Sequence, residues 1–240
     1  MGIKYGASGA DIVSIKYGAS GQDVDQIIKD GNIYWSRSLM HESANRADAL
    51  GLGANWTNVL NIGDGGGSPY LASIFAGTIR MNIPDGLIGL NPQTSHWRWT
   101  PSVTNGDDGY IEVQIANKGS VLDAAAYSCA WRRCLNTGFT TAVGLGFFPS
   151  GVKIVRRVAS ANTSMADCGS FSDGDIIRMV QVGNVHTVYR EGRAVGEWND
   201  SSATATKGVN NRSMALTMGG TKDFLGPRRF SASFNYIECR

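Results

Sequence analysis

Apolar and polar residues alternate with a period of two along most of this chain, in short runs separated by glycine, asparagine and aspartate. The clearest run spans residues 173–198, where odd and even positions between 176 and 182 fall on opposite faces of an extended chain. Gly183-Asn184 and Glu191-Gly192 suit tight two-residue turns, the first with a positive φ at its first position. The pattern therefore predicts an antiparallel meander of three strands at residues 176–182, 185–190 and 193–198.

Similar runs continue from about residue 40 to residue 239. Further strands are predicted at residues 110–115, 127–134, 141–148, 152–158, 212–218 and 230–237. Residues 41–50 are the only candidate for helical spacing, and we expect a loop or a short helical turn there. Roughly a dozen antiparallel strands need two sheets to cover their apolar faces. The predicted fold is all-β, a two-sheet antiparallel jelly-roll sandwich.

The first residues repeat a strand-like phrase. IKYGASG occurs at residues 3–9 and 15–21, and IIKDGNIYWS at 27–36 is a degenerate third copy. Such short strand ribbons are too small to form a hydrophobic core of their own. They need a partner surface, either on their own domain or on another protein. We predict an attachment ribbon over residues 1–38 and the sandwich over 39–240. The residues expected to dock are Ile3, Tyr5, Ile15, Tyr17, Tyr34 and Trp35.

Composition narrows the class of protein. Hydrophobic residues make up 42% of the chain and charged residues 18%, which is typical of a folded protein. The net charge of +2, with both signs interspersed, gives no electrostatic case for binding nucleic acid or an anionic membrane. No signal peptide or membrane-spanning run is expected, so the product is predicted to fold in the cytoplasm where it is made. The four cysteines show no metal-binding spacing, and we expect free thiols.

Two resemblances follow from these motifs. The repeated N-terminal phrase resembles the N-terminal segments of minor tail proteins from phages of actinobacteria. Residues 43–239 resemble the concanavalin A-like lectin/glucanase (LamG-like) jelly roll. The matching phrases are NRADALGLGANWTNV at 45–59, DDGYIEVQI at 107–115 and SFSDGDIIRMVQVGNVHTVYREGRAVGEWND at 170–200. FSASFNYIE at 230–238 is similar to that family's last strand, which usually lies near the first.

Glucanases of this fold carry a Glu-x-Asp-x-Glu run on one strand, which sets two carboxylates on one face. None of the five glutamates here lies in such a run. Asp107, Asp108, Asp173 and Asp175 are interpreted as turn residues. His41, His96 and His186 show no nucleophile motif, and GDGGGS at 63–68 lacks the lysine of a phosphate loop. We therefore predict that the chain is not an enzyme and that it holds no cofactor or metal.

The most distinctive local run is SHWRWT at residues 95–100. Trp97 and Trp99 share one face of a strand, and Tyr127 and Trp131 would line the same curved sheet. Outward-facing rings of this kind suit the apolar faces of sugars, so these four residues are the candidate carbohydrate site. The alternative is that both tryptophans belong to the core or to a subunit contact. The pattern alone leaves both interpretations open.

Together the two resemblances imply a structural virion protein of a phage tail or tail tip, which docks through its N-terminus and displays a β-sandwich. Its expected partners are other virion proteins and further copies of itself in a trimer or ring. One alternative is a lectin-like module that contacts host cell-wall glycan during adsorption. Another is a capsid decoration protein.

Overall fold

The computed structural model describes residues 40–63, 69–85 and 89–240, together with the backbone of four short earlier strands. The chain divides into two compact units, Met1–Ser38 and Leu39–Arg240. In the first unit, β1 (Lys16–Tyr17) pairs with β2 (Gln22–Asp23), and β3 (Gln26–Lys29) pairs with β4 (Asn32–Ser36). The degenerate third copy of the strand-like phrase, at residues 27–36, thus contains β4 and most of β3. The predicted docking residues Ile3, Tyr5 and Ile15 lie outside the described residues.

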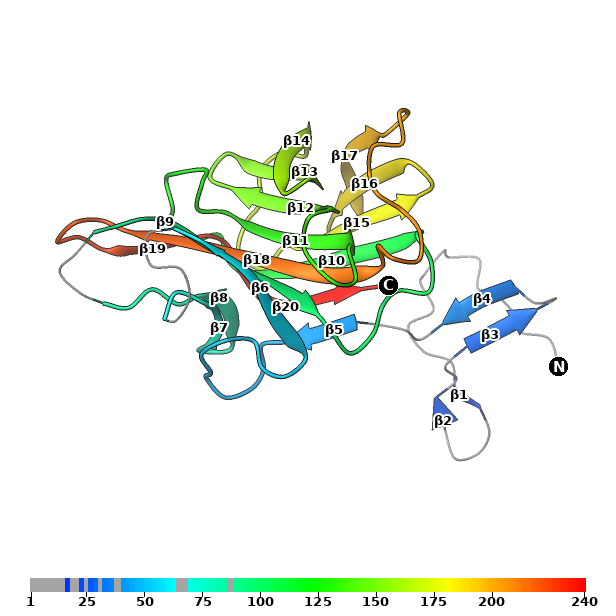
Figure 1. The fold of residues 1–240 in the computed structure, drawn as a ribbon, viewed down its shortest axis with the longest axis horizontal. Helices are drawn as coiled ribbons and strands as arrows, with labels where there is room; N and C mark the ends of the chain where they lie inside the picture. Colours follow the sequence, from blue (N-terminus) through cyan, green and yellow to red (C-terminus); the bar gives the residue numbers. More distant parts are fainter. Residues whose placement is uncertain are drawn as a thin grey trace. The chain divides into compact units, whose positions relative to one another are not determined.

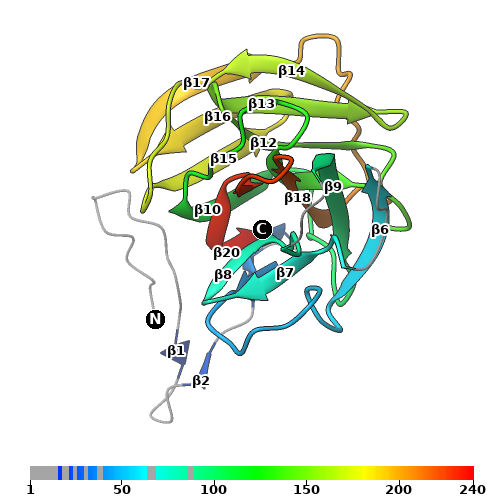
Figure 2. The same ribbon diagram turned by 90° about the vertical axis from the view of Figure 1, so that its left-hand side faces the viewer.

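The second unit is a sandwich of two eight-stranded antiparallel sheets, shown in two views in Figures 1 and 2. We call them sheet I and sheet II. The strand order of sheet I is β17 (Arg193–Asn199), β16 (Val185–Arg190), β15 (Ile176–Val182), β10 (Gly109–Asn117), β20 (Ser233–Cys239), β8 (Thr78–Met81) and β7 (Ala72–Phe75), with β5 (Met40–Ser43) also beside β20. Figure 2 shows β7 and β8 at the opposite end of the sandwich from β16 and β17.

The strand order of sheet II is β14 (Ala161–Asp167), β13 (Gly151–Val158), β12 (Ala142–Phe148), β11 (Ser128–Cys134), β18 (Ser213–Lys222), β9 (Leu90–Trp99) and β6 (Trp56–Ile62), with β19 (Arg228–Phe230) also beside β18. The described residues contain no helix, and so none that is long and apolar enough to span a membrane. The predicted all-β, two-sheet antiparallel sandwich is therefore confirmed.

The core lies between the two sheets, where period-two alternation places the apolar side chains. Ile111, Val113 and Ile115 of β10 are fully buried, and Val143 and Leu145 of β12 join the same core cluster from sheet II. Each such side chain contributes about 1.5–3 kcal/mol when it is fully removed from water. The described members of this cluster run from Met40 to Cys239.

The predicted meander is confirmed as β15, β16 and β17. Gly183 opens its first turn with a φ of 57°, and Glu191 and Gly192 form the second with φ values of 50° and 75°. Two-residue hairpin turns with positive φ have a backbone twist that matches the twist of the flanking strands. The first and last strands of the sandwich were expected to lie near each other. This is confirmed, because β5 pairs with β20 over Met40–Ser43.

Candidate functional site

Trp97 and Trp99 lie in the core. They share one face of β9 as predicted, but that face points toward sheet I, and each residue is only 7% exposed. The Trp99 ring packs edge-on against Trp56, with 5.3 Å between the ring centroids. The indole N–H of Trp97 donates to Ser95 Oγ at 2.8 Å. Rings buried in this way offer no face to a sugar, so the core interpretation holds for both tryptophans.

Trp131 lies on the opposite face of sheet II and is also fully buried. The loop between β11 and β12 folds back over this face and covers the indole with Phe139, at 5.5 Å between ring centroids. Phe139 also packs on His96 at 5.1 Å, and the Arg157 guanidinium lies 4.3 Å from the Phe139 centroid. This closed aromatic cluster excludes Trp131 from a surface site.

His96 is enclosed in the same cluster. Its Nδ1 lies 2.7 Å from Thr217 Oγ1 and its Nε2 lies 3.2 Å from Thr94 Oγ1. Burial, with a smaller contribution from Arg157, lowers the pKa of His96 to about 3. The imidazole is therefore neutral near pH 7. Because both of its nitrogens are held by threonine hydroxyls, the ring serves packing rather than proton transfer.

Tyr127 is the one member of the predicted carbohydrate site that is partly exposed. Its ring stacks on Phe148, with 5.3 Å between centroids and 19° between ring planes. Asn162 Nδ2 donates to the Tyr127 hydroxyl. Tyr127 and Trp131 thus share one face of sheet II, whereas Trp97 and Trp99 lie on the other. The four predicted residues do not form a single site.

A pair of carboxylates that the sequence did not reveal lies on sheet I. Glu112 of β10 and Glu238 of β20 are directly opposite each other. Arg178 and the Tyr236 hydroxyl donate to the two oxygens of Glu112, at 2.6 and 2.7 Å. Tyr110 donates to one oxygen of Glu238 at 3.0 Å, and His41 Nδ1 lies 3.4 Å from the other. All four oxygens have partners, so both carboxylates are held in place.

The four aspartates expected in turns each accept a backbone N–H. Asp107, Asp108, Asp173 and Asp175 bind the amides of Gly208, Gly183, Lys118 and Ser172, respectively. Within the described ranges, no group of three or more His, Cys, Asp or Glu side chains gathers in a way that would hold a metal ion. All four cysteines are buried free thiols, as predicted.

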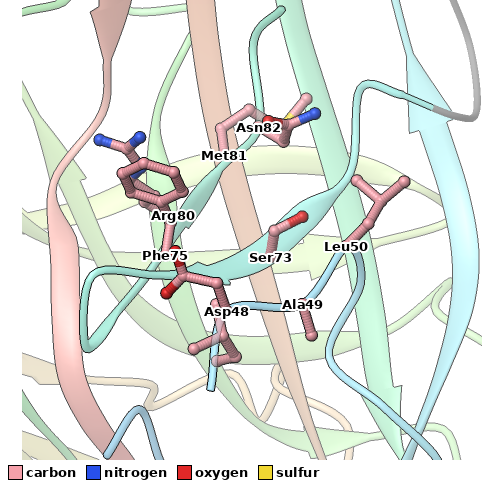
Figure 3. A pocket seen from close by; sticks show the side chains of 9 residues that line it. Asp48, Ala49, Leu50, Ser73, Phe75, Arg80, Met81 and Asn82 are labelled. Atoms are coloured by element: carbon pink, nitrogen blue, oxygen red, sulfur yellow. The ribbon is translucent and has the colours of Figure 1, made fainter. Parts of the chain in front are cut away.

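A cavity of about 340 Å³ opens beside the hairpin of β7 and β8. Figure 3 shows its lining: Asp48, Ala49, Leu50, Ser73, Ile74, Phe75, Arg80, Met81 and Asn82. Residues 48–50 run alongside β7, where Ala49 forms a bridge with Ile74. Sequence reasoning missed this site because β7 and β8 have only four residues each, too few to show a strand pattern.

No family model and no curated protein matches this sequence. Solved structures do match in fold. An endo-acting O-glycanase of human gut bacteria, described as initiating mucin breakdown, superposes with a TM-score of 0.55 at 8% identity, covering 83% of this chain and 97% of its own. LamAcat from Zobellia galactanivorans superposes with a TM-score of 0.50 at 10% identity, and the match covers 83% of this chain and 96% of LamAcat.

The carbohydrate-binding module CBM66 from Bacillus subtilis gives a TM-score of 0.47 at 12% identity, covering 79% of this chain and 94% of its own. At such low identities, similarity shows the fold alone. The sandwich has the concanavalin A-like jelly-roll fold.

Proposed function

We propose that this chain is a structural virion protein of a phage tail or tail tip, which docks through residues 1–38 and displays the sandwich. The observation that carries the proposal is the division into two units, of which the first contains the repeated IKYGASG phrase. Its described strands form two-stranded pairs, and such pairs are marginal in isolation. They would gain stability by pairing with strands of a neighbouring protein.

The test is incorporation into particles. Deleting residues 1–36 should leave a soluble, folded sandwich that no longer joins virions. A matched control replaces the same segment with a shuffled sequence of identical composition, which should also fail to incorporate. If the deleted protein is found in particles at the normal copy number, the docking proposal is wrong. Locating the full-length protein in intact particles by labelling separates a tail protein from a capsid decoration protein.

A role in display, without hydrolysis, is supported by the carboxylates of the sandwich. Retaining glycosidases need one carboxylate free to attack the sugar and another to give up a proton. Glu112 and Glu238 instead have partners on every oxygen. We propose that the chain releases no reducing ends from peptidoglycan, arabinogalactan or simple β-glucans. Release that disappears in Glu112→Gln would contradict this.

Symmetry adds a proposal about assembly. Repeated structural proteins form closed symmetric oligomers, so we propose a trimer or a ring. Light scattering on the full-length protein tests this, and a mass of 25.6 kDa at all concentrations would count against it.

A second candidate function is carbohydrate binding, with host cell-wall glycan as the ligand. The observation that favours it is the cavity beside β7 and β8, which combines an exposed aromatic ring with polar side chains. Binding of the sandwich to isolated cell-wall fragments, measured by co-sedimentation, tests the function independently of any one site. Absence of binding to fragments that intact particles do bind would exclude it.

A further inference from the structure

The cavity beside β7 and β8 contains an arginine for which the described residues provide no hydrogen-bond acceptor. The Arg80 guanidinium lies between two phenyl rings, 3.9 Å from the Phe75 centroid and 4.7 Å from the Phe230 centroid. Among the described residues, Arg80 has neither a hydrogen-bond acceptor nor an ion-pair partner, and its Nε is shielded from solvent. A guanidinium presents five N–H donors in one plane. The two rings accept no hydrogen bond in the plane of the guanidinium, so its N–H groups are left for an acceptor from a ligand.

The charge around the cavity favours an anion. Burial and the neighbouring Arg228 together lower the pKa of Arg80, against the opposing effect of Asp48. One oxygen of Asp48 already accepts the amide of Ala76, at 2.7 Å. The Arg228 guanidinium donates to Ile83 O at 3.1 Å and lies 6.0 Å from the centroid of Phe230, the ring that Arg80 also contacts, so a second positive charge is close to Arg80. A planar carboxylate matches the edge of a guanidinium through two parallel hydrogen bonds.

The rest of the lining suits a sugar ring. Phe75 is 46% exposed and Leu50 is 55% exposed, so both offer apolar surface at the mouth of the cavity. Asn82 Nδ2 donates to Pro69 O at 2.7 Å, which leaves Asn82 Oδ1 as an acceptor for a hydroxyl. Figure 3 shows Phe75, Arg80 and Asp48 at one end of the cavity and Leu50 at the other. Apolar surface beside a few fixed polar groups is the usual composition of a small-ligand site.

We propose that this cavity binds a carbohydrate unit that carries a carboxylate, with the carboxylate on Arg80, the sugar ring against Phe75 and Leu50, and a hydroxyl on Asn82. The volume of about 340 Å³ is at the small end of the range for ligand sites, which suits one or two sugar units. The inference deepens the second candidate function and rests on it. It is independent of the docking role of residues 1–38.

The experiment compares two ligands with the same sugar backbone, one with charged carboxylates and one with each carboxylate masked as a methyl ester. Trigalacturonic acid and its full methyl ester are titrated into the full-length protein by calorimetry, with glucuronic acid and inorganic phosphate as further ligands. We expect the free acid to bind at least about tenfold more tightly than the ester, because a charge-assisted hydrogen bond is roughly twice as strong as a neutral one. Glucuronic acid should bind more tightly than phosphate, which lacks the sugar ring.

The variants locate the site. Arg80→Gln should abolish the preference for the free acid, and Arg80→Lys should not restore it, because an ammonium lacks the planar edge. Phe75→Ala keeps the charge and should weaken the binding of both trigalacturonic acid and its ester. This variant tests the site even if Arg80→Gln fails to fold. Arg193→Gln is the matched control, since it removes the same charge from an exposed position on β17 and should change nothing.

Each contrary outcome is distinguishable. Equal binding of acid and ester overturns the proposed ligand class but leaves the second candidate function standing. Binding of the acid that is unchanged in Arg80→Gln and Phe75→Ala overturns the site. Binding of phosphate as tight as that of glucuronic acid would reveal a simple anion site and overturn the carbohydrate assignment. No binding of any of these ligands overturns the inference, while the assay with cell-wall fragments judges the second candidate function separately.

Discussion

Trp99 is a residue on which the stability of the sandwich depends. Its ring lies against Trp56, and its indole N–H donates to Ser102 Oγ at 3.2 Å. Trp99→Ala should lower the free energy of unfolding by about 3–5 kcal/mol, because it removes a large buried ring and leaves a cavity. Urea denaturation followed by circular dichroism measures the change. Phe224→Ala is the control, since Phe224 is 75% exposed and its loss should change stability by less than about 0.5 kcal/mol.

The buried histidines make stability depend on pH. The pKa of His96 is about 3 in the folded protein against 6.5 for a free histidine, so the unfolded chain binds more protons below pH 6.5. Stability should therefore fall as the pH decreases from 6.5, by up to about 1.4 kcal/mol per pH unit from this one group. Burial, with Arg133 as a further cause, lowers the pKa of His186 to about 4, and this adds to the fall.

Urea unfolding at pH 7 and pH 5 tests this dependence on pH. The loss of stability between the two conditions should be smaller in His96→Gln, which keeps a polar side chain that does not titrate. An equal loss in the variant and the parent protein would show that His96 makes no contribution in this range.

At the scale of strands, β12 has glycine at positions where aromatic side chains pack directly against its backbone. A Cβ on Gly144 would lie 2.2 Å from the carbonyl oxygen of Ala130 and 2.9 Å from the Trp131 ring. Gly144→Ala should therefore force β11 and β12 apart and destabilise the protein by about 1–3 kcal/mol. Gly138→Ala, in the loop that carries Phe139, is the control. Its nearest atom would be a flexible Leu135 methyl at 3.4 Å, so we expect little change in the thermal melt.

Local alternation was sufficient to predict the strands that bury one face completely, such as β10 and β15. It missed β14, because that strand is largely exposed and polar, and it missed β19, which has only three residues. Alternation also placed Trp97 and Trp99 on one face without showing which face points inward.

Glu112 and Glu238 are 126 residues apart in sequence, since 238 − 112 = 126, and only the register of β10 with β20 brings them together. Site geometry of this kind depends on pairing between distant strands, which a local pattern does not contain.

At the scale of the whole molecule, the sandwich should fold without residues 1–38. The described residues of the core cluster lie in the second unit, so the truncated protein keeps the apolar contacts that they make between the sheets. We expect residues 39–240 to unfold cooperatively, with a free energy of unfolding within about 1 kcal/mol of the full chain. Calorimetry on the two proteins measures this. A broad transition without a heat-absorption peak would mean that the first unit is required for folding.

The position of β20 has a consequence for synthesis on the ribosome. This strand is the last of the sandwich in chain order, yet it lies inside sheet I, with β10 on one side and β5 and β8 on the other. The meander of β15 to β17 joins neighbours in sequence and is able to form early, because its contacts are local. β5 and β8 are synthesised more than 150 residues before their neighbour β20, since β8 ends at Met81 and β20 begins at Ser233. During translation the edges of β5 and β8 that pair with β20 lack that partner, so we expect the nascent chain to bind chaperones until residue 239 emerges.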